Sequence, residues 1–361
     1  MRKVLKKIVF SIPGGPEALA ATRARKRRRK VNALRRRCYA ADVANDIRYL
    51  NWHREGADYW KLSSELIFQH HKLEKGLCLP PEARAWFGRT AALETFRLME
   101  EWKTHGFDRS APVYQSALGI LAAYRARLEG IADDNPERLE LIARITAYLE
   151  DTAPEPAYAT PLPARPAPEG VLPMLQELAL ARRSTRNFTD RKVDPAMVAE
   201  AARIGALAPS ACNRQPWKVH LYDDPARIRA MLELQNGNSG FGHTVPLLAV
   251  ICADQGSFFD SSERFEPVLD GGLFLMSFLY GLQAQGLASC CLNWAVPPER
   301  DAEGHARGDI PPEHKILTFL AVGHPAPGAV VPLSGRRPLE DTLHWHSETA
   351  SVTSPAAAAA Q

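Results

Sequence analysis

Side chains able to bind an anion gather in one short segment of the C-terminal half of the sequence. Residues 182–188, Arg-Arg-Ser-Thr-Arg-Asn-Phe, place three guanidiniums and two hydroxyls within five positions. Guanidiniums match phosphate and carboxylate oxygens in a bidentate geometry, and hydroxyls add further hydrogen bonds. The segment indicates a site for an anion with several oxygens, although an arginine cluster is more often a solvated surface.

A second segment, residues 208–217, offers amide groups on a loop that prolines restrict. Pro209 and Pro216 bound the loop, and Asn213 and Gln215 lie between them. A side-chain amide both donates and accepts hydrogen bonds, which suits the edge of a flat heterocycle. By itself this pattern is also typical of an ordinary turn.

A third segment, residues 286–294, is predicted to lead from a long buried helix into a strand. Its candidate contact residues are Cys290, Cys291 and Asn293. A fourth feature is the basic pair Arg336 and Arg337, which lies near the end of the same half. Each segment alone is weak evidence for a site, so their shared order and spacing carry the argument.

Together these segments resemble the nitroreductase family of flavin-dependent enzymes. The matching patterns are Arg-x-Ser-x-Arg-x-Phe at 182–188, Pro-Ser-x-x-Asn-x-Gln-Pro-Trp at 209–217, Asp-Gly-Gly at 270–272 and Val-Gly-His-Pro at 322–325. The resemblance covers roughly residues 171–345, about half of the chain. It implies an α+β fold, with a mixed sheet flanked by helices, and a homodimer that binds FMN noncovalently at sites built from both subunits.

The resemblance also implies which residues contact FMN. They are Arg182, Arg183, Ser184, Arg186, Ser210, Asn213, Gln215, Asn238, Cys290, Cys291, Asn293, Arg336 and Arg337. Arg182 and Ser184 would lie on the phosphate and ribityl side, and Arg186 near the phosphate or the pyrimidine edge. The 210–215 group, from the other subunit, would flank the ring. Asn238 would face the pyrimidine side, and the 290–293 strand would lie behind the ring. The closing basic pair matches in part only, because Ser334 stands where the family often has lysine.

The implied function is an FMN-dependent oxidoreductase that uses NAD(P)H for two-electron reduction of a small electrophilic substrate, such as a nitro compound, a quinone or another metabolite. The flavin carries the chemistry in such enzymes, so neither a protein nucleophile nor a metal is expected. Two alternatives stay open: a variant that modifies flavin or dehalogenates its substrate, and a flavin-lacking pseudoenzyme that acts as a membrane-associated binding or assembly protein.

The sequence before residue 153 has helical periodicity and nothing that alternates like a strand. Helices are expected at 17–50, 56–75, 90–103, 112–129 and 136–150. The expected organisation is a basic arm at 1–37, a helical region at 38–152, a proline-rich linker at 153–173, the FMN-binding domain at 174–346 and a disordered tail at 347–361. Within the domain, strands are expected at 217–222, 247–253 and 315–322, and helices at 172–183, 194–207, 224–235 and 266–285.

Charge is distributed unevenly along the chain. The net charge is +4, yet residues 1–37 carry +13, so the remainder is acidic at −9. Such an arm suits an anionic membrane surface or nucleic acid, and a solvated helix is the third reading. No recognition element accompanies it, so sequence-specific nucleic-acid binding is not expected.

Two further features bear on location and metal binding. The apolar start is broken by Lys6 and Lys7, and the six cysteines have no zinc spacing, so a reduced, cytoplasmic protein is expected, with peripheral contact at the inner membrane face as an option. His71 and Glu74 lie three residues apart in a His-His-Lys-Leu-Glu-Lys-Gly-Leu string. A helix end whose Lys75 offsets the helix dipole is favoured over a metal pair. Similar strings precede nitroreductase-like domains in some bacterial proteins, so the string is also a candidate contact with that domain.

Overall fold

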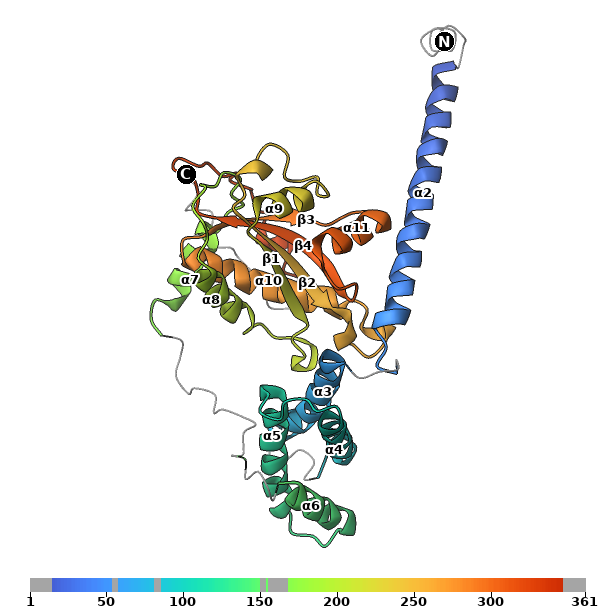
Figure 1. Cartoon of the computed structure of the whole chain (residues 1–361), viewed down its shortest axis with the longest axis vertical. Helices are drawn as coiled ribbons and strands as arrows, with labels where there is room; N and C mark the ends of the chain where they lie inside the picture. Colours follow the sequence, from blue (N-terminus) through green and yellow to red (C-terminus); the bar gives the residue numbers. More distant parts are fainter. Residues whose placement is uncertain (1–14, 54–57, 81–85, 150–153, 155–167, 347–361) are drawn as a thin grey trace.

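The computed structural model describes residues 15–53, 58–80, 86–149, 154 and 168–346. Its C-terminal part is built around strand β2, Leu247–Asp254, in which all eight residues are buried. Alternate side chains of a strand point to opposite faces of the sheet, so a strand buried along its whole length needs cover on both sides. One face packs against α8 (Pro195–Gly205) and α10 (Glu266–Ala284), and the other against α9 (Pro225–Leu232) (Figure 1).

The sheet has four strands in the order β1-β2-β4-β3. The other strands are β1 (Trp217–Tyr222), β3 (Ala288–Asn293) and β4 (His314–Gly323). All three pairings are antiparallel, with Leu247 opposite Val322 and a register shift between Ile251 and Cys252. The expected α+β class is confirmed. A mixed sheet was expected, but the pairings of the described strands are all antiparallel. Strands β3 and β4, for example, run in opposite directions and are joined through α11 (Pro298–Gly308). A parallel contact occurs as an isolated bridge between Ser184 and Ser289.

Most elements of this part lie where the sequence predicts them. Strand β1 has the expected bounds, and α8 begins with the expected cap, since the Asp194 carboxylate accepts a hydrogen bond of 2.8 Å from the Ala196 N–H. The sequence analysis missed α11, because its eleven residues, Pro-Glu-Arg-Asp-Ala-Glu-Gly-His-Ala-Arg-Gly, contain no large apolar side chain. Without such side chains there is no helical periodicity to detect.

The described residues before 150 form only helices, as expected. They are α2 (Gly15–Tyr49), α3 (Tyr59–Leu77), α4 (Arg89–Thr104), α5 (Pro112–Glu129) and α6 (Pro136–Leu149). Helices α3 to α6 share a core of their own, separate from the two beside the sheet, in which Phe96, Trp102 and Tyr124 are fully buried. Residues 15–149 therefore contain a second packed unit joined to the sheet part.

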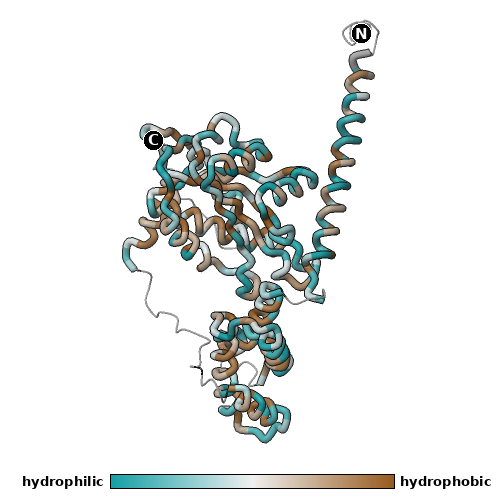
Figure 2. The backbone as a smooth tube through the Cα atoms, viewed as in Figure 1, coloured by the Kyte–Doolittle hydropathy of each residue, from teal (hydrophilic) through white to brown (hydrophobic). Residues whose placement is uncertain are grey.

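Helix α2 is a long rod that projects beside the sheet (Figure 1). The predicted end of the basic arm, residue 37, lies inside this helix. The boundary there is therefore a change in charge along one helix and not a change in secondary structure. Between Arg23 and Lys30 seven of eight residues are basic, so at 3.6 residues per turn they occupy every side of the helix. Figure 2 shows hydrophilic residues recurring along α2. No helix in the described ranges combines the length and apolarity that a membrane span needs. The first 14 residues, most of the proline-rich linker and the tail at 347–361 lie outside the described residues.

Short elements complete the sheet part. Helix α7 (Val171–Ala181) packs on α10, and one-turn helices lie at η1 (Ala211–Asn213), η2 (Gly242–Thr244), η3 (Gln255–Ser257), η4 (Ser261–Glu263) and η5 (Leu339–Asp341). Helix α3 of the helical region contacts η1 and η3. This contact matters for the site, because η1 lies inside the 208–217 loop.

Candidate functional site

The arginine segment and the cysteine strand, a hundred residues apart in the sequence, lie side by side. The Thr185 N–H donates to the Ser289 carbonyl oxygen over 3.0 Å, beside the bridge between Ser184 and Ser289. Burial raises the pKa of the Cys290 thiol, while the Arg186 guanidinium and a hydrogen bond with Ser184 lower it. Burial and the neighbouring Cys290 raise the pKa of the Cys291 thiol, whereas the Arg182 guanidinium lowers that pKa. Both thiols are therefore held in the neutral form, which is a poor nucleophile.

Within the described ranges, the guanidiniums of this segment have no carboxylate partner. Some arginines elsewhere on the surface are paired, as Arg97 is with Glu94 at 2.8 Å and Arg203 with Glu200 at 2.6 Å. Across the described ranges, none of the five arginines expected at the site makes an ion pair within 4.0 Å; they are Arg182, Arg183, Arg186, Arg336 and Arg337. Arg186 donates instead to the Ser184 carbonyl oxygen at 3.3 Å. Positive charge without local compensation is what an anion site requires.

The 208–217 loop presents its two amide side chains on the surface. Asn213 and Gln215 are exposed, and the Gln215 Nε2 donates to the Asn213 carbonyl oxygen over 3.0 Å. The Ser210 Oγ accepts a hydrogen bond of 3.0 Å from the Gln215 N–H, which closes the loop on itself. The Ser210 hydroxyl and the Gln215 amide nitrogen thus have partners within the loop, whereas the remaining donor and acceptor groups of the two exposed amides can meet a ligand.

The backbone of this loop is strained. Cys212, Asn213 and Gln215 have φ values of 50°, 57° and 54°, in the left-handed region that side chains disfavour. Non-glycine residues held in such regions cost about 1–3 kcal/mol each and persist only where the surroundings fix them. The loop must therefore be anchored by contacts from outside it.

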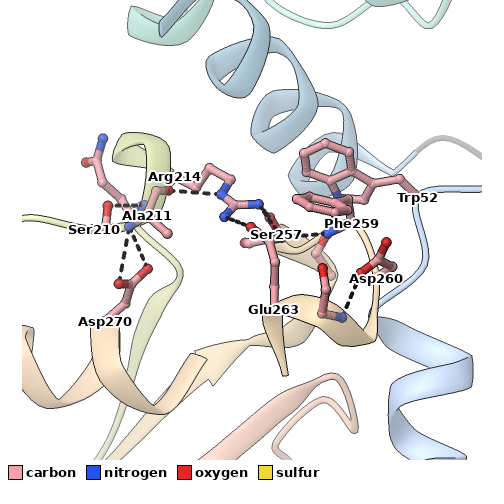
Figure 3. Close-up of polar contacts among 12 residues, drawn as sticks. Trp52, Ser210, Ala211, Arg214, Ser257, Phe259, Asp260, Glu263 and Asp270 are labelled. Carbon is pink, nitrogen blue, oxygen red and sulfur yellow. Dashed lines mark hydrogen bonds and ion pairs between the residues drawn. The ribbon is translucent and has the colours of Figure 1, made fainter. Parts of the chain in front are cut away.

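One anchor is the Asp270 carboxylate at the start of α10. Its two oxygens accept from the Ala211 N–H at 3.2 and 3.0 Å (Figure 3). Asp270 is 2% exposed. Burial raises its pKa to about 6, against the opposing effect of the Ala211 hydrogen bond. Asp270 opens the Asp-Gly-Gly pattern, but the sequence analysis did not assign it a role at the loop.

The second anchor is Arg214, whose side chain is fully buried. Its guanidinium pairs with both oxygens of Glu263, at 2.8 and 2.6 Å, and donates to the Ser257 carbonyl oxygen at 3.1 Å (Figure 3). Its Nε donates to the Ala211 carbonyl oxygen at 2.9 Å. The ion pair with Glu263 balances the buried charge, and the bond to Ala211 ties it to the strained turn.

Aromatic rings from both parts of the chain surround Arg214. Its guanidinium carbon lies 4.7 Å from the Phe258 ring centroid, 5.5 Å from that of Phe68 and 5.8 Å from that of Trp52. Phe258 belongs to the sheet part, whereas Phe68 lies on α3 and Trp52 between α2 and α3. The sequence analysis missed Arg214, because its partners come from residues 52, 68, 257 and 263, and no local pattern links them.

Asn238 is committed to a structural role through its amide nitrogen. Its Nδ2 donates to the Leu232 carbonyl oxygen at 2.8 Å and to the Gln235 carbonyl oxygen at 2.6 Å, which closes the end of α9. The Gln235 Nε2 in turn donates to the Asn293 carbonyl oxygen over 3.0 Å, so this loop is tied to β3. The Asn293 side chain is exposed.

The basic pair near the end of the domain lies on an exposed extended segment. Arg336 donates to the carbonyl oxygen of Ser334, a residue with a left-handed φ of 52°. The chain leading to this segment is fixed to the arginine cluster, because the Ala326 N–H donates to the Asn187 carbonyl oxygen at 3.1 Å. Arg336 and Arg337 follow further along the chain, and within the described residues neither makes a hydrogen bond or ion pair with residues 182–188.

The remaining aromatic and histidine candidates have packing partners. Trp217 stacks on Phe274 and Trp294 on Phe319, with centroid distances of 5.2 and 4.4 Å. The His71 Nδ1 lies 2.6 Å from a Glu74 carboxylate oxygen, within the last turns of α3. The described residues include no group of three or more potential metal ligands.

The raised pKa of Asp270 predicts a specific pH dependence. Its carboxyl binds a proton more tightly in the folded chain, with a pKa of about 6, than at its ordinary value of 3.8. Its contribution to the free energy of unfolding is therefore full below pH 3.8 and is lost as pH rises through about 6. Urea unfolding of wild type and Asp270→Asn should show that wild type loses stability relative to the variant over this range. A constant difference would contradict the assignment.

Comparison with known proteins gives the family. A sequence profile of the nitroreductase family matches residues 179–238. A Thermus thermophilus protein named NADH dehydrogenase is 35% identical over 210 residues, covering 49% of this chain and 99% of that protein. A Streptomyces coelicolor protein, named as a candidate NADH dehydrogenase/NAD(P)H nitroreductase, is 26% identical over 206 residues, covering 51% and 97%. A solved FMN-dependent nitroreductase from Clostridium difficile aligns at 17% identity and a TM-score of 0.41, covering 48% and 98%.

The Thermus relative is matched along almost its whole length, and the residues that the family profile matches contain the arginine segment and the 208–217 loop. The chain therefore belongs to the nitroreductase family.

Proposed function

We propose that this protein is an FMN-dependent oxidoreductase that uses NAD(P)H for two-electron reduction of a small electrophilic substrate. The observation that carries the proposal is the set of unpaired guanidiniums beside β3, where Arg182 and Arg186 neighbour the Cys291 and Cys290 thiols. A flavin nucleotide combines a phosphate, which such a set would bind, with a flat ring that amide edges would flank. The names of the relatives, NADH dehydrogenase and NAD(P)H nitroreductase, support the same class of reaction.

In this proposal residues 174–346 form the FMN-binding domain. Arg182, Ser184 and Arg186 hold the phosphate and ribityl end of FMN. Arg336 and Arg337 add positive charge from the exposed segment that follows β4. Asn213 and Gln215 flank the ring, and the backbone of residues 290–293 lies behind it. When bound, FMN supplies the two-electron chemistry, while these residues bind and orient it and keep water from the ring. Because the thiols behind the ring are neutral, the charged groups that act on the redox chemistry of the ring are the surrounding guanidiniums.

The phosphate role of Arg182 can be tested by removing its side chain. A hydrogen bond from a charged donor contributes about 1.5–3 kcal/mol, so Arg182→Ala should weaken FMN binding by about tenfold or more. Quenching of flavin fluorescence on titration into apoprotein measures this. Arg203→Ala is the control, because Arg203 is an exposed arginine on α8 whose partner is Glu200. Full flavin occupancy in Arg182→Ala would contradict the assignment.

A homodimer would complete the site from two chains, and the surface offers a face for it. Helix α7 has no buried residue, although most of its side chains are apolar. Helix α10 exposes a stripe at helical spacing, namely Phe265, Val268, Leu269, Leu273 and Met276. Contiguous apolar surface of this kind marks an interaction site. Because α7 packs on α10, the two helices form one face, and we propose that a second copy covers it.

A charge placed in this face should separate the subunits. Leu269→Glu would bury an unpaired carboxylate in the interface, which is unfavourable. Light scattering should give a mass near twice 39.9 kDa for wild type and a shift toward the single-chain mass for the variant. Val43→Glu, at an exposed site on α2, should leave the mass unchanged. A monomeric wild type would overturn the dimer.

For the basic arm we propose cytoplasmic attachment to an anionic membrane surface. Arginines and lysines surround α2 between residues 23 and 30, so this part has no apolar face for insertion. Its binding would rest on attraction to headgroups, worth about 1 kcal/mol per basic side chain near the surface. Attraction of this kind falls steeply with salt.

Charge neutralisation in α2 tests the membrane proposal. Arg27, Arg28 and Arg29 all changed to Gln should reduce sedimentation with phosphatidylglycerol vesicles by about tenfold or more, since three charges are lost. The same positions changed to Lys keep the charge and should keep binding. Reduction of a nitro or quinone substrate should be unaffected in both. If the wild-type protein does not sediment with these vesicles at low salt, the proposal is wrong.

A further inference from the structure

The 208–217 loop depends on contacts that the sheet part alone does not complete. Three of its residues hold a left-handed backbone, and its internal bonds include the Ser210–Gln215 closure, the Gln215–Asn213 amide contact and two backbone bonds, from Asn213 to Ser210 and from Arg214 to Ala211. Asp270 fixes the N–H of Ala211, and Arg214 fixes the carbonyl oxygen of the same residue. The turn is thus held at one residue from two sides, and the Arg214 side reaches toward the helical region (Figure 3).

The helical region forms one wall of the Arg214 pocket. Trp52 and Phe68 pack edge to face at 5.3 Å, and both contact Phe259, at 5.9 and 5.7 Å. Trp52 is itself fixed to the sheet part, because its Nε1 donates to the Gly256 carbonyl oxygen at 3.1 Å. Its backbone N–H also donates to the Phe259 carbonyl oxygen at 3.4 Å. The rings therefore present fixed faces to the guanidinium and exclude water from it.

We propose that Trp52 and Phe68 are positioning residues for the 208–217 loop, on which they act through Arg214. In this arrangement the helical region is part of the cofactor site and not an independent attachment. The inference rests on the proposed function, since it takes loop 208–217 to flank FMN. It adds that residues outside the matched half of the chain set how well that loop receives the ring.

Charge and burial explain why the effect passes through Arg214. A guanidinium with no exposed surface requires all its neighbours to stay in place, because water entering the pocket would compete for its hydrogen bonds. Loss of an aromatic wall admits water and loosens the bidentate pair with Glu263. Of its two donors, the Ala211 carbonyl oxygen then loses the Arg214 Nε and keeps the Arg214 backbone N–H. With one side of this anchor released, the left-handed turn can relax toward a conformation in which Asn213 and Gln215 no longer present their amides together.

The test compares two substitutions at Trp52. Trp52→Phe keeps an aromatic face and removes the hydrogen bond to Gly256, whereas Trp52→Leu removes the face. We expect Trp52→Leu to weaken FMN binding by about tenfold and Trp52→Phe to stay within about twofold of wild type, since the ring face is what contacts the cation. Phe68→Leu should behave as Trp52→Leu does. Far-ultraviolet circular dichroism and thermal unfolding establish that each variant is folded.

Repeating the Trp52→Leu substitution in a protein that lacks the buried ion pair shows whether Trp52 affects FMN binding through Arg214. The pair Arg214→Met with Glu263→Gln removes both buried charges together, so neither is left unpaired. In this background FMN binding is already weakened, and Trp52→Leu should add less than about twofold, because the ring no longer has a cation to hold. The reduction potential of bound FMN, measured in parallel, should shift with Trp52→Leu in the wild-type background only.

The outcomes separate the two proposals. If wild-type protein binds no FMN, the proposed function fails. If wild type binds FMN and folded Trp52→Leu and Phe68→Leu bind it equally well, the positioning role is wrong. If Trp52→Leu weakens binding by the same factor in both backgrounds, the effect does not pass through Arg214 and the inference is likewise wrong. Non-additive loss, with Trp52→Phe near wild type, supports it.

Discussion

The 208–217 loop of the candidate site depends on the buried Arg214 guanidinium. This guanidinium lies between the 208–217 loop, the η3–η4 segment and the aromatic wall of the helical region, and the Glu263 carboxylate balances its charge. A buried charge is tolerated only where its partners are fixed. The requirements of one side chain thus hold a strained turn, the segment that follows β2 and a helical bundle in a single arrangement.

This arrangement places rigidity where a flavin site needs it. The loop backbone stores strain at three residues, and the anchors Asp270 and Arg214 both act on Ala211. By contrast, the arginines at 182–186 lie beside a buried strand and keep their charge uncompensated by carboxylates in the described residues. Phosphate binding would therefore depend on charge, and ring orientation on backbone geometry, so the two can be perturbed separately.

The parts of the fold that were predictable depend on local patterns. Strand β1 and the Asp194 cap follow from residues close in sequence, and the family motifs locate the arginine segment and the loop. Arg214 was not predictable, because its environment is assembled from four distant segments. The Asn238 amide nitrogen closes α9 through hydrogen bonds to the Leu232 and Gln235 carbonyl oxygens, a structural contact that the sequence pattern did not indicate. Helix α11 lacks the apolar periodicity that would reveal it.

The most direct test of this account is the visible absorption spectrum of purified protein incubated with FMN and freed of excess, before and after anaerobic NADH or NADPH. The account predicts that flavin bands remain with the protein, because unpaired guanidiniums and a fixed loop hold the cofactor, and that either nucleotide bleaches them. A folded protein that retains no flavin would contradict it. Retained flavin that neither nucleotide bleaches would contradict the proposed reaction while leaving the binding site intact.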